Sequence, residues 1–232
     1  MDTLDEVRTK LAPDGLLRAL SPEQLDELLQ KSSRRELEQG EVIINQGDPR
    51  GDFAVYILSG GLKVSVCSAS GNEIILSFCA PGELVGEIAL LDRGPRTATV
   101  TASLPSSVLV VPTQAFLDVI SANPKSVVRV MRQMARRMRQ LNLVVESDRS
   151  FTMGPRLARA LVRLIDPTRT DGRLIHDPNQ SDLGAFAGLA RENVSRMLAE
   201  WETQGLIERD GRAIVVRDAD SLQLLADFGD EA

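Results

Sequence analysis

The sequence predicts an α+β fold in three parts: an N-terminal β-barrel of the jelly-roll type, a long helix, and a C-terminal winged helix-turn-helix. Three observations predict it. Short β-branched runs separated by turns fill residues 42–111. A long helical pattern follows from residue 124 to about 148. The last third has two short helical patterns joined by a glycine and followed by a hairpin. We place the domains at 1–122, 123–150 and 151–232.

Composition excludes several classes of protein. The 232 residues carry a net charge of −6, with 43% hydrophobic and 26% charged residues, which is typical of a soluble globular protein. The first residues are acidic where a signal peptide needs basic and apolar ones, so we expect a cytoplasmic protein. The uncharged stretch 97–117 contains prolines and many hydroxyl residues, so it is expected to form strands and turns, not a membrane span. Two cysteines, Cys67 and Cys79, and one histidine, His176, argue against a disulfide framework, a metal site or a catalytic dyad.

The N-terminal elements follow from local signals. Residues 3–31 are expected to form short helices, because Ser21 is a cap and Pro22 stands at a first helical position before an apolar leucine stripe. Turn residues such as Gly47-Asp48-Pro49 and Gly71-Asn72 separate the strands. The strands are expected at 42–44, 52–58, 62–66, 73–78, 97–102 and 108–111.

The stretch PGELVGEIALLDRGPRTATV, residues 81–100, carries the most chemical information. Gly86 and Glu87 open a one-turn helix at Ile88 and Ala89, whose unpaired N–H groups suit an anion. Arg96, followed by Thr97, adds a planar guanidinium that can hold a phosphate through two hydrogen bonds. Glu87 can only accept hydrogen bonds, so its expected partner is a sugar hydroxyl. The candidate ligand-binding residues are Gly86, Glu87, Ile88, Ala89, Arg96 and Thr97.

A simpler alternative is that Glu87 and Arg96 form a structural ion pair in a β-rich core. The complete motif, in order, favours a small nucleotide with one phosphate charge and a free ribose hydroxyl. A triphosphate would require a glycine-rich loop with a lysine and a metal ligand, which the motif lacks.

The long helix has apolar residues at alternating spacings of four and three, a heptad pattern typical of a two-stranded coiled coil. It predicts a parallel homodimer. The alternative is a helix that packs on its own domain. The candidate dimer-interface residues are Val127, Met131, Met134, Met138, Leu141 and Val145.

Gly154-Pro155 interrupts the helical pattern and is expected to be the hinge into the last domain. A helix is expected at 156–165 and a short strand near 173–175. Asn179 caps a helix that runs through Ala187. Gly188 makes the turn into a second helix at 191–203, and segments 206–209 and 212–216 form a hairpin.

The second of these helices presents polar side chains in its first turns, where a recognition helix meets the major groove. Arginine can bind guanine with two hydrogen bonds, and glutamate can accept from cytosine. The alternative is a solvated helix face in which Glu192 pairs with Arg196. The opposite face is expected to be core, Trp201 included. The candidate DNA-binding residues are Arg191, Glu192, Asn193 and Arg196.

Residues 81–100 closely resemble the phosphate-binding cassette of cyclic-nucleotide-binding domains. The chain also resembles the cAMP receptor protein family of bacterial transcription regulators over nearly its full length, most closely at QMARRM (133–138) and ARENVSRML (190–198). The resemblance implies a homodimer that binds cAMP or cGMP as allosteric ligand and double-stranded promoter DNA with palindromic, TGTGA-like half-sites. RNA polymerase is a further expected partner. It also implies that Arg96 and Thr97 hold the cyclic phosphate, and Glu87 the ribose hydroxyl.

Leu141, Asn142 and Ala190 depart from the family prototype, and Thr97 also bears on the choice of base. Leu141 and Asn142 stand where the prototype has Thr and Ser beside the adenine, and Asn142 can bind adenine or guanine. Thr97 accompanies cGMP preference in some eukaryotic relatives. Ala190 replaces a serine, which removes a helix cap worth about 1 kcal/mol. Ligand-independent or cyclic di-GMP-responsive regulators, an enzyme regulated by this domain, and a purely architectural DNA-binding dimer remain alternatives. No catalytic motif appears, so we expect no enzyme.

Overall fold

The computed structural model describes residue 7 and residues 16–69, 71–122, 124–166, 169–211 and 213–228, without the side chains at 133, 137, 140 and 143–150. The chain divides into two compact units, which are described separately. The first comprises residues 1–66 and 77–140, and the second residues 67–76 and 141–232. No helix among the described residues is long and apolar enough to cross a membrane.

The first helices of the first unit begin as their cap predicts. Ser21 accepts a hydrogen bond from the Gln24 N–H, and the Gln24 side chain returns one to the Ser21 backbone, which completes a capping box. Most of the region expected to form helices before residue 16 lies outside the described residues. The helices here are η1 (Leu16–Ala19) and α2 (Pro22–Gln30).

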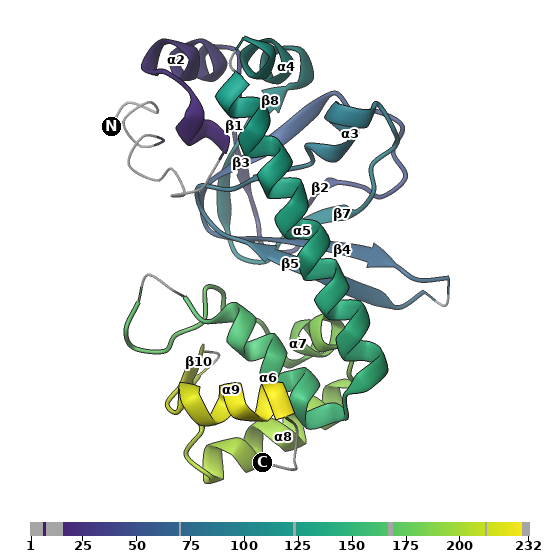
Figure 1. Ribbon diagram of the computed structural model, residues 1–232, viewed down its shortest axis with the longest axis vertical. Helices are drawn as coiled ribbons and strands as arrows, with labels where there is room; N and C mark the ends of the chain where they lie inside the picture. Colours follow the sequence, from purple (N-terminus) through teal and green to yellow (C-terminus); the bar gives the residue numbers. More distant parts are fainter. Residues whose placement is uncertain are drawn as a thin grey trace. The chain divides into compact units, whose positions relative to one another are not determined.

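Two four-stranded antiparallel sheets form the barrel, in the orders β1-β8-β3-β6 and β2-β7-β4-β5 (Figure 1). All six predicted β-branched runs are strands, which confirms the predicted fold class. The strands are β1 (Ser33–Leu37), β2 (Val42–Ile44), β3 (Phe53–Ser59), β4 (Leu62–Cys67), β5 (Glu73–Cys79), β6 (Leu84–Val85), β7 (Thr99–Ala102) and β8 (Ser106–Pro112).

The central strand β3 contributes to two hydrophobic cores because its side chains alternate between its faces. Val55 and Ile57 pack into the core between the two sheets. Tyr56 and Leu58 join a second core with helices α2, α4 (Thr113–Ser121) and α5 (Pro124–Ser150). The burial of β3 from both sides fixes the position of Phe53, the first residue of the strand.

Three elements depart from the predictions. The expectation of strands and turns throughout 97–117 is wrong, because α4 begins at Thr113 directly after β8. Pro112 precedes this helix without a side-chain cap, so the usual start signal is missing. Strands β1 and β6 are additional: β1 is mostly exposed and charged, and β6 has only two residues.

The long helix α5 packs on the first unit through one face. Ser126 and Val130 are buried there, and Met134 packs against the same core. The expected hinge at Gly154-Pro155 is wrong, because both residues lie in the first turn of α6 (Met153–Leu164) and the helical break falls at residues 151–152. Proline is tolerated there because the first N–H groups of a helix have no partner within it.

The second unit contains the predicted helix-turn-helix and hairpin. The expected short strand near 173–175 is reduced to isolated bridges, which pair Leu174 with Ile165 and Arg173 with Val215. A final helix was not predicted from the sequence. The elements are α7 (Gln180–Ala187), α8 (Arg191–Thr203), β9 (Ile207–Asp210), β10 (Ala213–Val216) and α9 (Ala219–Phe228).

Candidate ligand and DNA sites

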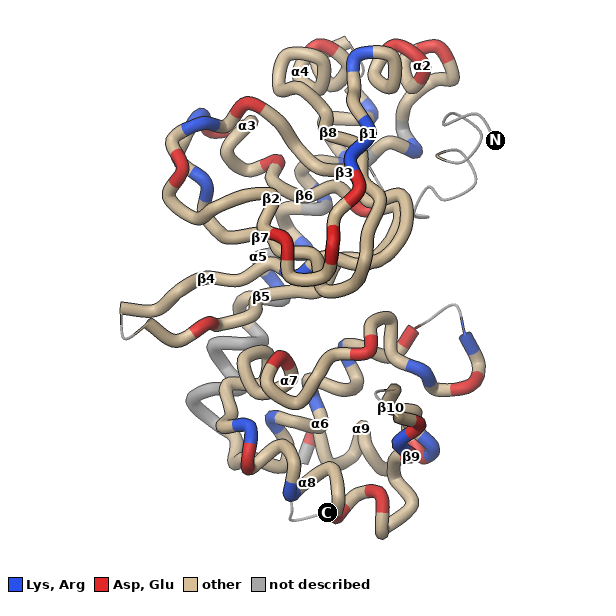
Figure 2. The backbone as a smooth tube through the Cα atoms, turned by 180° about the vertical axis from the view of Figure 1, so that it is seen from behind, with Lys and Arg blue, Asp and Glu red and all other residues tan. Residues whose placement is uncertain are grey.

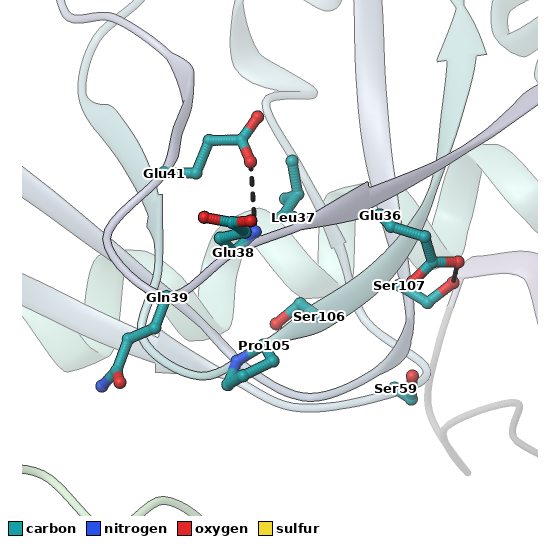
Figure 3. A pocket seen from close by; sticks show the side chains of 9 residues that line it. All are labelled: Glu36, Leu37, Glu38, Gln39, Glu41, Ser59, Pro105, Ser106 and Ser107. Carbon is teal, nitrogen blue, oxygen red and sulfur yellow. Dashed lines mark hydrogen bonds between the residues drawn. The ribbon is translucent and has the colours of Figure 1, made fainter.

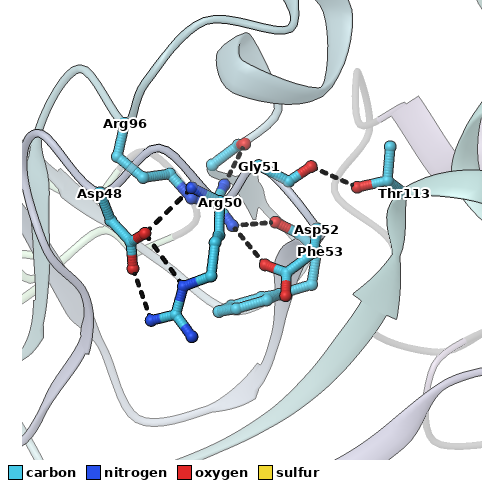
Figure 4. Close-up of polar contacts among 8 residues, drawn as sticks. Asp48, Arg50, Gly51, Asp52, Phe53, Arg96 and Thr113 are labelled. Carbon is cyan, nitrogen blue, oxygen red and sulfur yellow. Dashed lines mark hydrogen bonds and ion pairs between the residues drawn. The ribbon is translucent and has the colours of Figure 1, made fainter.

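Arg96 is the buried centre of the predicted phosphate cassette, with only 4% of its surface exposed. Its Nη1 donates to the Gly86 carbonyl at 2.9 Å and its Nη2 to the Phe53 carbonyl at 2.6 Å. The guanidinium also lies over the Phe53 ring, 4.8 Å from the ring centroid (Figure 4). Arg96 therefore ties the end of β6 to the start of β3, using two of its five N–H groups.

Position 86 requires a glycine, both because of its backbone conformation and because there is no room for a side chain. Its φ of +84° lies in the left-handed region, and a Cβ there would come within 2.7 Å of Ile44 Cδ1 and 3.1 Å of Arg96 Nη1. Glu87 follows at the start of the short helix α3 (Ile88–Asp92), with 1% of its surface exposed. The cassette thus combines a close-approach glycine that contacts a buried guanidinium with a buried carboxylate at the next position, residue types that fit a small anionic ligand with a hydroxyl.

The loop before β3 is locked to the cassette by backbone hydrogen bonds. The Gly47 N–H donates to the Arg96 carbonyl, and the Arg96 N–H donates to the Asp48 carbonyl, both at 2.8 Å. Gly51 packs so closely on α3 that a Cβ would lie 2.8 Å from the Ala89 carbonyl oxygen. Residues 47–52 are therefore one wall of the candidate site.

Two carboxylates in this loop act on Arg96. Its Nη2 lies 3.8 Å from Asp52 Oδ1, so Asp52 forms an ion pair with Arg96. The alternative of a structural Glu87–Arg96 pair stays a prediction. Burial lowers the pKa of Arg96, while Asp52 and Asp48 act in the opposite direction. Hydrogen bonds from Arg50 hold the pKa of Asp48 below its usual value. Sequence reasoning treated this loop as a turn and missed these charges.

The remaining predicted ligand residues lie in different surroundings. Ala89 is buried, Ile88 is half-buried and Thr97 is exposed beside Arg96 in the sequence. Asn142 is exposed on α5, in the part of the chain assigned to the second unit. Its role as a base contact stays a prediction.

A cavity of about 540 Å³ lies elsewhere in the barrel domain, and no cassette residue lines it (Figure 3). Two of its three carboxylates have partners: Glu36 accepts from Ser107 at 2.8 Å, and Glu41 from Arg35 at 2.7 Å. An acidic wall repels a phosphate, so we do not assign the ligand to this cavity. Its lining residues are Glu36, Leu37, Glu38, Gln39, Glu41, Ser59, Pro105, Ser106 and Ser107.

The helix-turn-helix is held by specific contacts around its turn. Asn179 caps α7 by accepting from the Asp182 N–H at 2.9 Å, as predicted. Gly188 ends the helix with a φ of +67°. Arg156 of α6, which the sequence analysis did not single out, donates to the Ala187 and Gly188 carbonyls. These contacts fix the direction in which α8 leaves the turn.

The predicted DNA-reading residues occupy the start of α8. Arg191, Glu192 and Arg196 are exposed and Asn193 is half-buried. In the described part of the chain Arg196 donates to Asn193 Oδ1 at 3.2 Å and forms no ion pair with Glu192, so the alternative of a salt-bridged face is not what the structure has. Ala190 provides no side-chain cap, as expected. The opposite face is buried and consists of Val194, Met197, Leu198 and Trp201.

Gly184 is expected to be indispensable for this turn. A Cβ at Gly184 would lie 2.6 Å from the Leu189 carbonyl oxygen, a backbone atom that cannot move without shifting α8. We expect Gly184→Ala to destabilise the second unit by about 1–3 kcal/mol and to abolish DNA binding while ligand binding to the first unit persists. Thermal unfolding with parallel DNA and nucleotide titrations checks this; unchanged DNA affinity would contradict it. Gly205→Ala is a comparison without crowding: its Cβ meets no atom within 4 Å, and its φ of +77° makes any loss a backbone effect that Gly184→Ala does not carry.

The predicted dimer stripe is mostly exposed. Met131 and Met138 are 65% and 67% exposed, and Val127 and Leu141 are also exposed. Met134 instead packs against the core of its own unit, so one face of α5 packs on its own domain. The dimer through the exposed face stays a prediction. The Val145 side chain lies outside the described residues.

Comparisons with known proteins identify two domains in the chain. Residues 34–123 match the cyclic nucleotide-binding domain, and residues 155–225 match the Crp-like helix-turn-helix domain. The first match contains the whole cassette, and the second contains the turn and helix α8. Within the described residues no group of three His, Cys, Asp or Glu side chains could hold a metal ion.

Curated relatives match over nearly the full chain. The chain is 31% identical over 214 residues to the cyclic AMP receptor protein of Thermus thermophilus, covering 92% of this chain and 97% of the relative. It is 28% identical over 224 residues to a CRP-like cAMP-activated global transcriptional regulator of Mycobacterium tuberculosis, covering 94% and 98%. Its fold resembles that of FixK2 from Bradyrhizobium japonicum, with a TM-score of 0.75, 22% identity and coverage of 84% and 96%. The chain therefore belongs to the CRP/FNR family of transcription regulators, with a cyclic nucleotide-binding domain and a helix-turn-helix DNA-binding domain, and it is not an enzyme.

Proposed function

We propose that this chain is a cytoplasmic homodimeric regulator that binds a cyclic mononucleotide, cAMP in the first place and cGMP as the other candidate. The ligand would favour the arrangement that binds palindromic promoter DNA with TGTGA-like half-sites. The observation that carries the proposal is the buried guanidinium of Arg96, which donates to the Gly86 carbonyl directly before the buried Glu87. Relatives named for cAMP activation support the choice of nucleotide.

Each part of the cassette has a distinct task in this proposal. The Arg96 guanidinium and the Thr97 hydroxyl bind the cyclic phosphate, and the N–H groups of Ile88 and Ala89 add donors. Glu87 accepts from the ribose 2′-hydroxyl. Asn142 on α5 contacts the base, so its side chain decides between adenine and guanine. An anion at Arg96 would take the place of Asp52 as its ion-pair partner.

Ligand binding regulates DNA binding only if the ligand prefers the DNA-competent arrangement. The two recognition helices of a dimer must then stand about 34 Å apart, one turn of DNA. Arg191, Glu192 and Arg196 would read base edges, and RNA polymerase is a proposed partner of the DNA-bound protein.

The exposed apolar residues of α5 support the homodimer. We expect Met138→Glu to convert the protein to a monomer, because a charge in a dry helix seam has no partner and must be desolvated. Sedimentation equilibrium measures this directly. Arg132→Glu is the matched control, since this exposed residue lies about a third of a turn around the helix from both methionines. A dimeric Met138→Glu protein would exclude this seam.

Calorimetric titration of the purified chain with cAMP and cGMP in parallel tests the ligand. Saturable binding of one of them, at micromolar concentration or tighter, supports the proposal and identifies the nucleotide. Heat from neither would reject it and leave a ligand-independent regulator or a cyclic di-GMP-responsive one. A parallel titration with cyclic di-GMP separates these two.

A further inference from the structure

The wing of the DNA-binding unit is formed by β9, β10 and their turn. Its described arginines are paired with carboxylates, unlike the arginines of the recognition helix. Among the described residues, the wing arginines are Arg173, which bridges to β10, Arg209 in β9, and Arg217 directly after β10. Each forms an ion pair with a carboxylate of the same unit. By contrast, neither Arg191 nor Arg196 has an ion pair in the described part of the chain.

The ion pairs cover both faces of β9. Arg209 shares a face with the buried Ile207 and reaches back to α8, where its Nε donates to Glu202 Oε2 at 2.8 Å and its N–H to Glu202 Oε1 at 3.2 Å. Glu208 and Asp210 point to the other face, as alternation along a strand requires. Glu208 accepts from Arg217 Nε at 2.7 Å.

The third pair lies beside the hairpin turn, where Arg173 Nη2 is 3.5 Å from Asp210 Oδ2. Figure 2 shows acidic and basic residues adjoining along β9. Three arginines and three carboxylates cancel, so these six side chains together carry no net charge.

We propose that Glu202, Glu208 and Asp210 restrain sequence-independent DNA binding by holding the wing arginines away from DNA phosphates. The inference rests on the proposed DNA-binding function of this unit. A carboxylate offers an arginine the same two-pronged acceptor geometry as a phosphate, so the two compete for one guanidinium. With these three arginines paired, they attract the phosphates of an arbitrary duplex less strongly. The base-reading arginines then make a larger share of the contacts.

Single substitutions can test this restraint, because one ion pair can be removed without unfolding the unit. Exposed ion pairs contribute little to stability, so removing one carboxylate leaves the unit folded and frees one arginine. Each added phosphate contact steepens the dependence of log K on log salt by about 0.9. At 0.1 M salt one contact corresponds to roughly fivefold to tenfold tighter binding to any duplex.

The experiment measures binding of the full-length protein, with and without cAMP, to a fluorescent random-sequence duplex across a salt series. Glu208→Gln and Glu202→Gln are each expected to tighten binding several-fold and to steepen the salt slope by about one. Glu208→Gln combined with Arg217→Ala should lose that gain. Glu200→Gln is the matched control, because it removes the same charge without freeing an arginine. In the described residues this exposed carboxylate of α8 accepts only from Gln204.

The outcomes separate the inference from the proposed function. If Glu208→Gln and Glu202→Gln behave like Glu200→Gln, the restraint is refuted while DNA binding stands. A gain that persists in the Arg217→Ala background also refutes it, because the gain would then reflect overall charge. If the unsubstituted protein fails to bind any duplex at low salt, the DNA-binding proposal itself fails. Thermal unfolding of each variant verifies that it is folded.

Discussion

Replacing Arg96 with lysine is expected to weaken binding of the cyclic nucleotide by about 10–100-fold. Lysine keeps the positive charge but loses the planar fork that offers a phosphate two parallel hydrogen bonds. A hydrogen bond to a charged group contributes about 1.5–3 kcal/mol, and each 1.4 kcal/mol corresponds to a factor of ten in affinity. Calorimetric titration of both proteins with the nucleotide measures the difference.

Lysine is the informative substitution because Arg96 also holds the fold. Its guanidinium donates to the carbonyls of Gly86 and Phe53, so alanine would leave two partly buried acceptors without these donors. Each such loss costs about 1–3 kcal/mol, and Arg96→Ala would confuse lost binding with lost folding.

Asp52→Asn is the matched control for Arg96→Lys. The Asp52 carboxylate lies 3.8 Å from Arg96 and would have to give way to a phosphate. Removing its charge should maintain or strengthen nucleotide binding, the opposite sign to Arg96→Lys. If Arg96→Lys binds as tightly as the unsubstituted protein, the phosphate does not bind at Arg96 and the cassette assignment is wrong.

The sequence identifies the chemistry of the ligand site but not its walls. Gly86, Glu87 and Arg96 stand out because their residue types have few other uses at that spacing. The loop at 47–52 does not, because its link to Arg96 consists of backbone hydrogen bonds between segments far apart in the chain. Backbone pairing of this kind leaves no trace in residue type. The competing charge of Asp52 is therefore visible only in the structure.

The same distinction explains which elements were predictable. β3 and β8 are buried β-branched runs, and their composition alone indicates strands. β1 is a strand only because it pairs with β8, since its exposed sequence SRREL has no apolar alternation. α4 continues a β-branched run without a cap, so only its packing against α2 and the core determines that it is a helix.

Arg191→Ala is expected to cost about 1–3 kcal/mol of discrimination between a specific and a random duplex. Arg191 is exposed at the first position of α8, and the contacts of Gly184, Gly188 and Arg156 fix the turn before it. Competition binding with duplexes that differ by one base pair measures the loss. Arg169→Ala is the matched control, since this exposed arginine of the same unit is paired with Asp171.

The pattern of loss decides between two roles for Arg191. If its guanidinium reads guanine, Arg191→Ala relaxes selectivity at one base pair and leaves the others unchanged. If it contacts phosphate, binding weakens almost uniformly across sequences and the salt slope falls by about one. The uncapped start of α8 at Ala190 leaves N–H groups that can themselves bind a phosphate. Arg191 then need not supply that contact and can reach the base edge. A uniform loss of affinity across sequences would show that Arg191 does not read bases. Glu192 and Arg196 would then be the candidate base-reading residues.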